Sequence, residues 1–207
     1  MDIKKQDLGI KKTEYLLTTA LTNLLRAHPF SRITVDSICI EAMVSRSTFY
    51  KHFEDKYALL RYTLHLMNRK RIINLEGKPL SEYIYSFLEH IKAESVSFRN
   101  ILSSGHNKEV LEIVLEPHFT NIKNAMIHKL KNDTSIPVDV AAYYHASAVV
   151  STIIMWVDQN MSYSTEEMSS YLTQMLPAEL KEMKLHLQTQ HNRPIKNKIQ
   201  EAENEKA

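Results

Sequence analysis

The side chains best suited to chemistry in this 207-residue chain lie close together, between Thr34 and Lys56. The run from Ser45 to Phe53 combines hydroxyl groups, a guanidinium, a phenol and an ammonium with two phenylalanines. An arginine can hold the edge of a guanine through two hydrogen bonds, and hydroxyl and lysine side chains suit phosphate groups. This combination of side chains is compatible with contact to duplex DNA.

Two short helices are expected to position these side chains. The first carries apolar residues at the i, i+3, i+4 and i+7 spacing of one helix face: Val35, Ile38, Cys39 and Ala42. Thr34 is a suitable N-cap for it, and Ser45 for the second helix. On the second helix Phe49 and Phe53 share one face and Lys51 lies opposite. A helix this short is not stable alone, so we expect it to be presented by the fold, as the second helix of a helix-turn-helix is.

The segment from Val44 to Phe53, followed by Lys56, resembles the recognition helix of TetR-type transcriptional regulators. A hydroxyl–x–Tyr–x–His–Phe run with a lysine three residues further on is the most recognisable segment of that family, and the resemblance covers about residues 10 to 60. Met43 is a departure, because the family usually has glycine at this place in the turn. A positive φ there costs a residue other than glycine about 1 kcal/mol or more.

The resemblance also implies which side chains contact DNA. Arg46, Ser47 and Tyr50 correspond to the family's base-contacting positions. The positions that correspond to phosphate contacts are Thr34, Thr48, Lys51, His52 and Lys56. Ser45, at the start of the helix, completes the expected set of DNA-binding residues.

Composition favours an all-α protein with enough residues for one large or two small domains. The chain has three glycines, six prolines and 43% hydrophobic residues. The single cysteine, Cys39, excludes an intramolecular disulfide and is expected in the core. The N-terminus lacks an apolar run of signal-peptide length, and we expect no membrane-spanning stretch of 18 apolar residues. We therefore expect a soluble, cytoplasmic protein.

The charge of the chain is unevenly distributed although its net value is only +2. Residues 1–73 carry a net charge of +6, residues 74–180 carry −6 and residues 181–207 carry +2. A basic N-terminal third on an acidic body fits a small DNA-binding head, although ordinary variation among solvated faces gives the same pattern. We expect a helix-turn-helix domain with its connecting fourth helix over residues 1–76, a helical ligand-binding and dimerisation domain over residues 77–180, and a polar C-terminal tail over residues 181–207.

The body is expected to be wholly helical. Pro117 predicts a break between two short helices, and Ser164 or Thr165 with Glu167 predicts a helix start. The segment from Val138 to Val157 is apolar on all sides, so it must be buried on more than one side. We expect the body to cover one side and a second copy of the chain to cover the other.

Val149 to Leu176 resembles the C-terminal segment of a TetR subgroup common in low-GC Gram-positive bacteria. The resemblance implies a homodimer with a four-helix interface, for which the candidate residues are Val149, Ile153, Val157, Tyr171, Leu172 and Met175. It also implies an unidentified small-molecule effector in the body. The candidate lining residues are Tyr83, Phe87, His90, Phe98, Phe119, Met126, Tyr144, His145 and Trp156, and at this spacing each is also compatible with a plain core position.

Neither metal binding nor catalysis is indicated. The ten histidines form no metal-ligand pattern, and the chain has no glycine-rich phosphate loop or nucleophile elbow. We expect no metal, no cofactor and no enzyme activity. The preferred hypothesis is a dimeric repressor released from a palindromic operator by a small ligand. In an alternative the body binds a protein partner, as an activator or a nucleoid-associated factor. A third and more distant hypothesis is a helical enzyme with a vestigial DNA-binding head.

Overall fold

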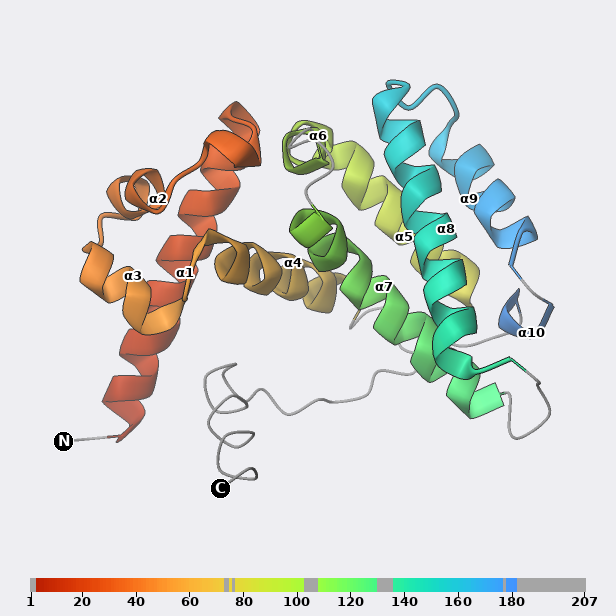
Figure 1. Ribbon diagram of the computed structural model, residues 1–207, viewed down its shortest axis with the longest axis horizontal. Helices are drawn as coiled ribbons and strands as arrows, with labels where there is room; N and C mark the ends of the chain where they lie inside the picture. The colour runs from red at the N-terminus through yellow and green to blue at the C-terminus, as the bar shows by residue number, and fades with distance from the viewer. Residues whose placement is uncertain are drawn as a thin grey trace.

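The computed structural model describes residues 3–72, 75, 77–102, 108–129, 136–176 and 178–181, and these are the described residues below. They form α-helices and one 3-10 helix but no β-strand (Figure 1). The all-α prediction is therefore confirmed. Residue 76, at the predicted domain boundary, and residues 182–207, nearly all of the predicted tail, lie outside the described residues, and the domain bounds stay predictions.

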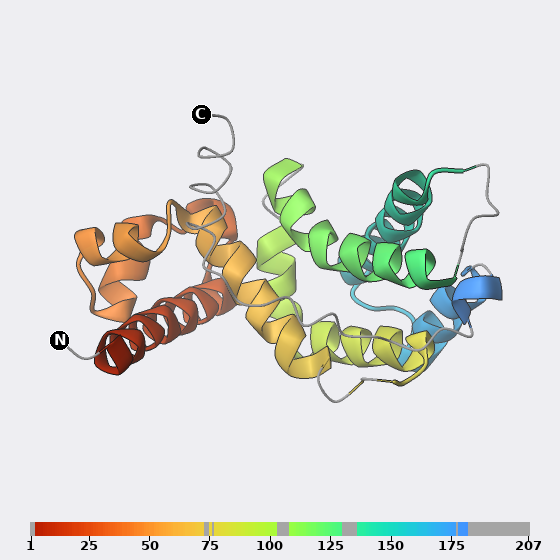
Figure 2. The same cartoon turned by 90° about the horizontal axis from the view of Figure 1, so that it is seen from below.

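Three helices form the head of the molecule: α1 (Ile3–Ala27), α2 (Val35–Ala42) and α3 (Arg46–His52). A 3-10 helix, η1 (Phe30–Arg32), joins α1 to α2, and α4 (Lys56–Ile72) follows α3. In Figures 1 and 2, α4 lies between α1 and the helices that follow α4 in the chain. The most buried apolar side chains of the head are Leu17, Leu21, Phe30, Ile33, Ile38, Phe49, Leu59 and Leu60.

The core of the head also includes side chains from two later helices, α6 (Ser95–Leu102) and α7 (Lys108–Lys129). Ile101 of α6 and Val110 and Ile113 of α7 belong to the same buried cluster as the head residues. On α6, the side-chain amide of Asn100 donates to the carbonyl oxygen of Leu25 at 2.8 Å. Head and body are therefore joined by packed side chains as well as by the chain itself.

The body consists of α5 (Leu80–Ala93), α8 (Val138–Asp158), α9 (Thr165–Gln174), α10 (Ala178–Lys181) and the C-terminal half of α7. Trp156 is fully buried at its centre, and its indole N–H donates to the carbonyl oxygen of Tyr163 at 2.9 Å. Ser164 and Glu167 form a reciprocal capping box at the start of α9, as their spacing predicts.

The predicted break at Pro117 is wrong, because α7 continues through this proline from Lys108 to Lys129. Proline cannot donate to the carbonyl four residues earlier, so the helix loses the bond to Ile113. Packing against other helices stabilises both halves: Ile113 contributes to the head core, while Ile122 and Met126 contribute to the body core. Tertiary contacts therefore offset the local cost of the proline.

Helix α8 corrects the expectation that no apolar stretch has the length of a membrane span. Among the described residues it alone is long and apolar enough to cross a membrane, by length and composition. The core helix of a soluble protein meets the same criteria, and α8 packs along α7 (Figure 1). Only 33% of its most apolar window is buried in one chain, and the other residues of the helix are half-buried or exposed.

Candidate functional site

The N-terminal end of α2 is closed by a reciprocal capping box. The Thr34 hydroxyl accepts from the backbone N–H of Ser37 at 3.1 Å, and the Ser37 hydroxyl accepts from the backbone N–H of Thr34 at 3.0 Å. Ile38, Cys39 and Ala42 are buried on the inner face of the helix, as their spacing predicts. The two hydroxyl groups therefore start α2 at a defined residue and orient it on the head core.

The turn between α2 and α3 depends on a left-handed residue. Met43 has a φ of 54° and a ψ of 41°. Its N–H donates to the carbonyl oxygen of Ile40 at 3.1 Å, and the N–H of Val44 donates to that of Cys39 at 3.0 Å. This is the Schellman arrangement, which usually uses glycine. Methionine costs about 1 kcal/mol more at such a residue, and its side chain is 93% exposed.

Helix α3 presents its polar side chains outward because its apolar face is anchored. Phe49 is fully buried and Phe53 nearly so, which confirms their predicted core positions. The Ser45 hydroxyl accepts from the backbone N–H of Thr48 at 3.1 Å and lies 2.9 Å from the hydroxyl of Ser47. The remaining surface of the helix exposes Arg46, Ser47, Tyr50 and Lys51.

Arg46 is held in place by one neighbour on each helix. Its guanidinium lies 2.8 Å from the carboxylate of Asp36 on α2 and 6.0 Å from the centre of the Tyr50 ring on α3. Hydrogen bonding to Tyr50 and the charge of Asp36 both raise the pKa of this guanidinium above its usual value. Asp36 is a residue that the sequence analysis missed, because only the crossing of α2 and α3 brings it to Arg46.

His52 faces the inside of the head. Its side chain is only 12% exposed, and its Nδ1 lies 3.9 Å from the carboxylate of Glu14 on α1. The other oxygen of that carboxylate accepts from the Tyr62 hydroxyl of α4 at 2.7 Å. Glu14, on α1, therefore lies between the recognition helix and α4. The contact of the largely buried His52 with a phosphate stays a prediction.

Lys56 also has a structural role. Its ammonium donates to the carbonyl oxygens of Phe30 at 3.0 Å and Ile33 at 2.8 Å, and lies 4.6 Å from the centre of the Phe30 ring. Burial lowers the pKa of this ammonium. Contact with a phosphate, as predicted from the sequence, requires Lys56 to exchange these partners, whereas Thr34, Ser47 and Lys51 are exposed.

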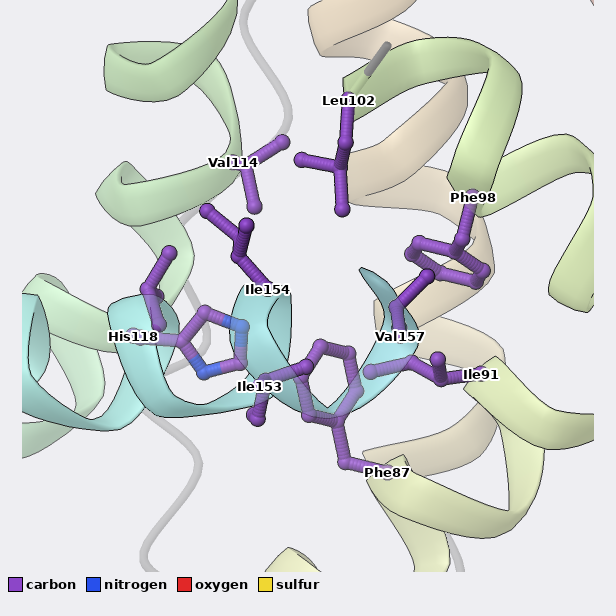
Figure 3. Close-up of a pocket in the computed structure, with 10 residues that line it drawn as sticks. Phe87, Ile91, Phe98, Leu102, Val114, His118, Ile153, Ile154 and Val157 are labelled. Atoms are coloured by element: carbon purple, nitrogen blue, oxygen red, sulfur yellow. The ribbon is translucent and has the colours of Figure 1, made fainter. Parts of the chain in front are cut away.

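The body contains two small adjoining cavities of about 20 and 30 Å³, so a ligand larger than a few atoms requires the surrounding helices to move apart. Phe87 and His118, whose ring centres are 4.4 Å apart, line both of them. Figure 3 shows the first cavity. The first cavity is otherwise lined by Ile91, Phe98, Leu102, Val114, Val150, Ile153, Ile154 and Val157. The second is otherwise lined by Leu64, Met67, Asn68, His90, Phe98, Ile113, Val114 and Pro117.

The cavities include three of the predicted effector-binding residues: Phe87, His90 and Phe98. Tyr83 lies next to them, with its hydroxyl 3.4 Å from Nδ1 of His118. The other predicted residues line neither cavity: Phe119, Met126, Tyr144, His145 and Trp156. Tyr144 is 68% exposed and Trp156 is fully buried. His118 and the α4 residues were missed, because their helical spacing does not differ from that of a core helix.

The predicted dimer residues divide into two groups. Tyr171 and Met175 are exposed and Val149 is half-buried. Ile153, Val157 and Leu172 are buried within the body core, where their own chain already covers most of their surface. Their contact with a second copy stays a prediction. The exposed large apolar side chains of α8, of α9 and of the residue that ends α9 are Val140, Tyr143, Tyr144, Met155, Tyr171 and Met175.

A metal site is not evident in the part of the chain that the structure describes, where no three His, Cys, Asp or Glu side chains are grouped closely enough to hold an ion. The expectation of no metal and no cofactor stays a prediction.

Two family models match the chain. One, described as bacterial regulatory proteins of the tetR family, matches residues 17–63, and one described as a transcriptional regulator C-terminal region matches residues 78–178. An uncharacterized HTH-type transcriptional regulator of Bacillus subtilis, YxbF, is 21% identical over 176 residues. The match covers 80% of this chain, which spans 45% of the length of that relative.

Solved structures show the same fold. A TetR transcriptional regulator from Streptococcus agalactiae has a TM-score of 0.63 at 24% identity and covers 84% of this chain and 98% of its own. The dihydroxyacetone kinase operon activator DhaS has a TM-score of 0.54 at 16% identity, covering 83% and 98%. A putative transcriptional regulator from Rhodococcus has a TM-score of 0.52 at 17% identity and covers 83% of this chain and 100% of its own. With a recognition helix held by α1, α2 and α4, and with family models matched on both head and body, this chain belongs to the TetR family of DNA-binding transcriptional regulators.

Proposed function

We propose that this regulator is a cytoplasmic, non-enzymatic homodimer that represses transcription from a palindromic operator and leaves it when a small molecule enters the body. The observation that carries this proposal is the position of the second cavity. Leu64, Met67 and Asn68 of α4 form part of its wall. Helix α4 begins at Lys56, four residues after His52, the last residue of the recognition helix.

This connection supports coupling between a ligand and DNA. A molecule that enlarges the cavity pushes on α4, and α4 carries Tyr62, which is bonded through Glu14 to α1. Displacement of α4 therefore changes the support of α3. Such a ligand lowers DNA affinity only if it binds more tightly to the displaced arrangement than to the DNA-bound one.

The cavity walls favour a small ligand that is mostly apolar and uncharged. Apart from Asn68, His90 and His118, the lining side chains are apolar, and no Asp, Glu, Lys or Arg is among the described lining residues. A charged ligand would lose its hydrating water in these cavities and find no opposite charge there, and burying an unpaired charge costs free energy. The two histidines and Asn68 can serve as hydrogen-bonding groups that orient the ligand.

The outer face of α8 supports the dimer. Val140, Tyr144 and Met155 follow one face of this helix, and all three are exposed, as are Tyr171 and Met175 on α9. An exposed apolar surface of this kind is typical of an interface between copies. A two-fold dimer presents two recognition helices to successive major grooves, which makes the preferred DNA site palindromic.

We assign the base contacts to Arg46, Ser47 and Tyr50 on the exposed side of α3. Lys51, Thr34 and Thr48 are assigned to phosphates. Lys51→Ala is then expected to weaken binding to every sequence and to reduce the slope of log affinity against log salt by about one unit. Arg46→Ala is expected to relax the preference at one base position. If the two variants behave alike, these assignments are wrong.

The test of the proposal is selection of the purified protein against random duplex DNA, followed by sequencing. A palindromic consensus bound by a dimer supports it. Small apolar compounds are then screened for release of that DNA, with Phe87→Trp as a variant whose larger side chain fills the cavity and prevents release. A protein that binds a consensus but is released only by another protein supports the alternative with a partner-binding body. The absence of a consensus contradicts sequence-specific regulation.

A further inference from the structure

We propose that Ile40 and Met43 form an apolar contact with thymine methyl groups in the bound DNA, beside the polar contacts of α3. This inference rests on the proposed function, in which α3 enters the major groove. It adds the α2–α3 turn to the surface that reads the base sequence, and it assigns a use to the residue at which this chain departs from the usual glycine of the turn.

The placement of the two residues follows from the contacts of α2. Asp36 and Ile40 are spaced i and i+4 on one face of α2, Met43 lies in the turn that ends this helix, and all three are exposed. The first of them, Asp36, is bound to Arg46 at the start of α3. The face of α2 that carries Ile40 therefore adjoins the side of α3 that exposes Arg46 and Tyr50.

The exposure of these side chains is not explained by the fold of one chain. Met43 has a positive φ, which is unfavourable for methionine, and its side chain is 93% exposed. Ile40 is 79% exposed, the second most exposed large apolar side chain among the described residues. Neither burial nor turn geometry in the free protein favours these residue types, so a partner that covers them is the physical reason we infer.

DNA is the partner that fits this position. The methyl group of thymine is the apolar group on the major-groove edges of the bases, next to the hydrogen-bonding groups that arginine and tyrosine contact. A second copy of the chain does not fit, because the apolar outer face of α8 and α9 lies at the opposite end of the molecule from α2 and α3 (Figure 1).

The test uses the operator obtained from the selection and replaces its thymines one at a time by deoxyuridine, which removes only the methyl group. The wild-type chain is expected to lose about fourfold in affinity at one or two positions of each half-site, the change that one buried methyl group gives. Met43→Gly is expected to bind the thymine operator about fourfold more weakly for each half-site, and to lose nothing more when deoxyuridine replaces the thymine that Met43 covers. Met43→Leu retains the discrimination.

Two controls separate this contact from general damage. Met43→Gly removes the unfavourable backbone conformation, so it is expected to raise the melting temperature while it weakens binding. Val96→Ala, which shortens an exposed apolar side chain on α6, is expected to change neither affinity nor discrimination.

Three results overturn the inference. In the first, no deoxyuridine position weakens wild-type binding although an operator is found. In the second, Met43→Gly and Ile40→Ala keep the full wild-type sensitivity to deoxyuridine. In both of these the proposed function remains supported. In the third, no operator sequence is enriched, and that result contradicts the proposed function together with the methyl contact.

Discussion

The head and the body of this regulator differ in how completely one chain covers its own apolar side chains. In the head, Phe49 and Ile38 are fully buried, and the ends of α2 and α3 are fixed by the Thr34 and Ser45 hydroxyls. In the body, α8 carries the fully buried Trp156 beside Met155, which is 40% exposed. The head is thus closed within one chain, whereas the body presents an apolar surface outward.

This difference corresponds to what each region has to do. A recognition helix must keep its side chains in a fixed geometry, and buried anchors with satisfied caps provide that. The pairing with a second copy and the entry of a ligand that we propose for the body need surface and space that one chain leaves uncovered. The exposed Ile40 and Met43 are exceptions in the head, and they adjoin its proposed DNA-binding surface.

The largest effect is expected from a substitution that tests whether α7 is needed to complete the core of the head. Ile113 is 1% exposed and belongs to the head core, although it lies 57 residues after Lys56 in the chain. Ile113→Ala is expected to lower the free energy of unfolding by about 2 to 5 kcal/mol, because it leaves a cavity. Urea denaturation measures the loss, and DNA binding should weaken with it.

The matched control is on the same helix. Ile127 is 50% exposed, so Ile127→Ala is expected to change the free energy of unfolding by less than about 0.5 kcal/mol. Equal effects of the two substitutions, or a stable Ile113→Ala protein with full DNA affinity, would show that the head core does not depend on α7.

The second prediction concerns the uncovered face of the body. Tyr144→Glu with Met155→Glu places two charges on the outer face of α8, where an apolar partner surface is proposed. The dimer dissociation constant is expected to rise at least about tenfold, or about 1.4 kcal/mol, in sedimentation experiments. Operator affinity should fall with it, because the two half-sites are no longer bound together. Val96→Glu, on the exposed side of α6, should leave the dimer intact; a dimer unchanged by the double substitution would contradict an α8 interface.

The third prediction uses the Glu14–Tyr62 pair that supports α3. Burial, the hydrogen bond to Glu14 and the charge of that carboxylate all raise the pKa of the Tyr62 phenol above its usual value of 10.0. The folded chain therefore keeps this proton at a pH where the unfolded chain loses it. The contribution to stability is complete below pH 10 and is lost as pH rises above it.

Tyr62→Phe is accordingly expected to lower the free energy of unfolding by about 1 to 2 kcal/mol at pH 7, because the carboxylate of Glu14 loses a hydrogen bond. Between pH 10 and pH 11 the stability of the wild-type chain should fall more steeply than that of the variant. Denaturation at a series of pH values measures both slopes. Parallel slopes would mean that the hydroxyl of Tyr62 ionises equally in the folded and unfolded chains.

The smallest effect is expected for an ion pair at the surface between head and body. Arg26 and Glu94 are bound at 3.0 Å, but both side chains contact solvent. Arg26→Ala is expected to leave the melting temperature unchanged within error, because water and salt screen such pairs. A clear loss of stability would mean that this ion pair, and not the packing of Ile113, holds head and body together.

Much of the head could be predicted from the sequence, because its signals are local. The spacing of Val35, Ile38 and Ala42 predicts α2, the hydroxyl of Ser45 predicts the start of α3, and Phe49 and Phe53 are buried as their positions predict. In the body, Pro117 gave a wrong prediction, since a proline penalises a helix locally while packing on both sides of it depends on distant residues.

The site residues divide in the same way. The sequence alone determined the all-α class, the two short helices and the types of side chain on α3, because each depends on neighbours within one or two helical turns. Only the tertiary structure decided that Lys56 and His52 turn toward the head, that Asp36 holds Arg46, and that α4 borders the cavity. Those contacts join residues from different helices, and helical periodicity tells which face of a helix is apolar but not which helix covers it.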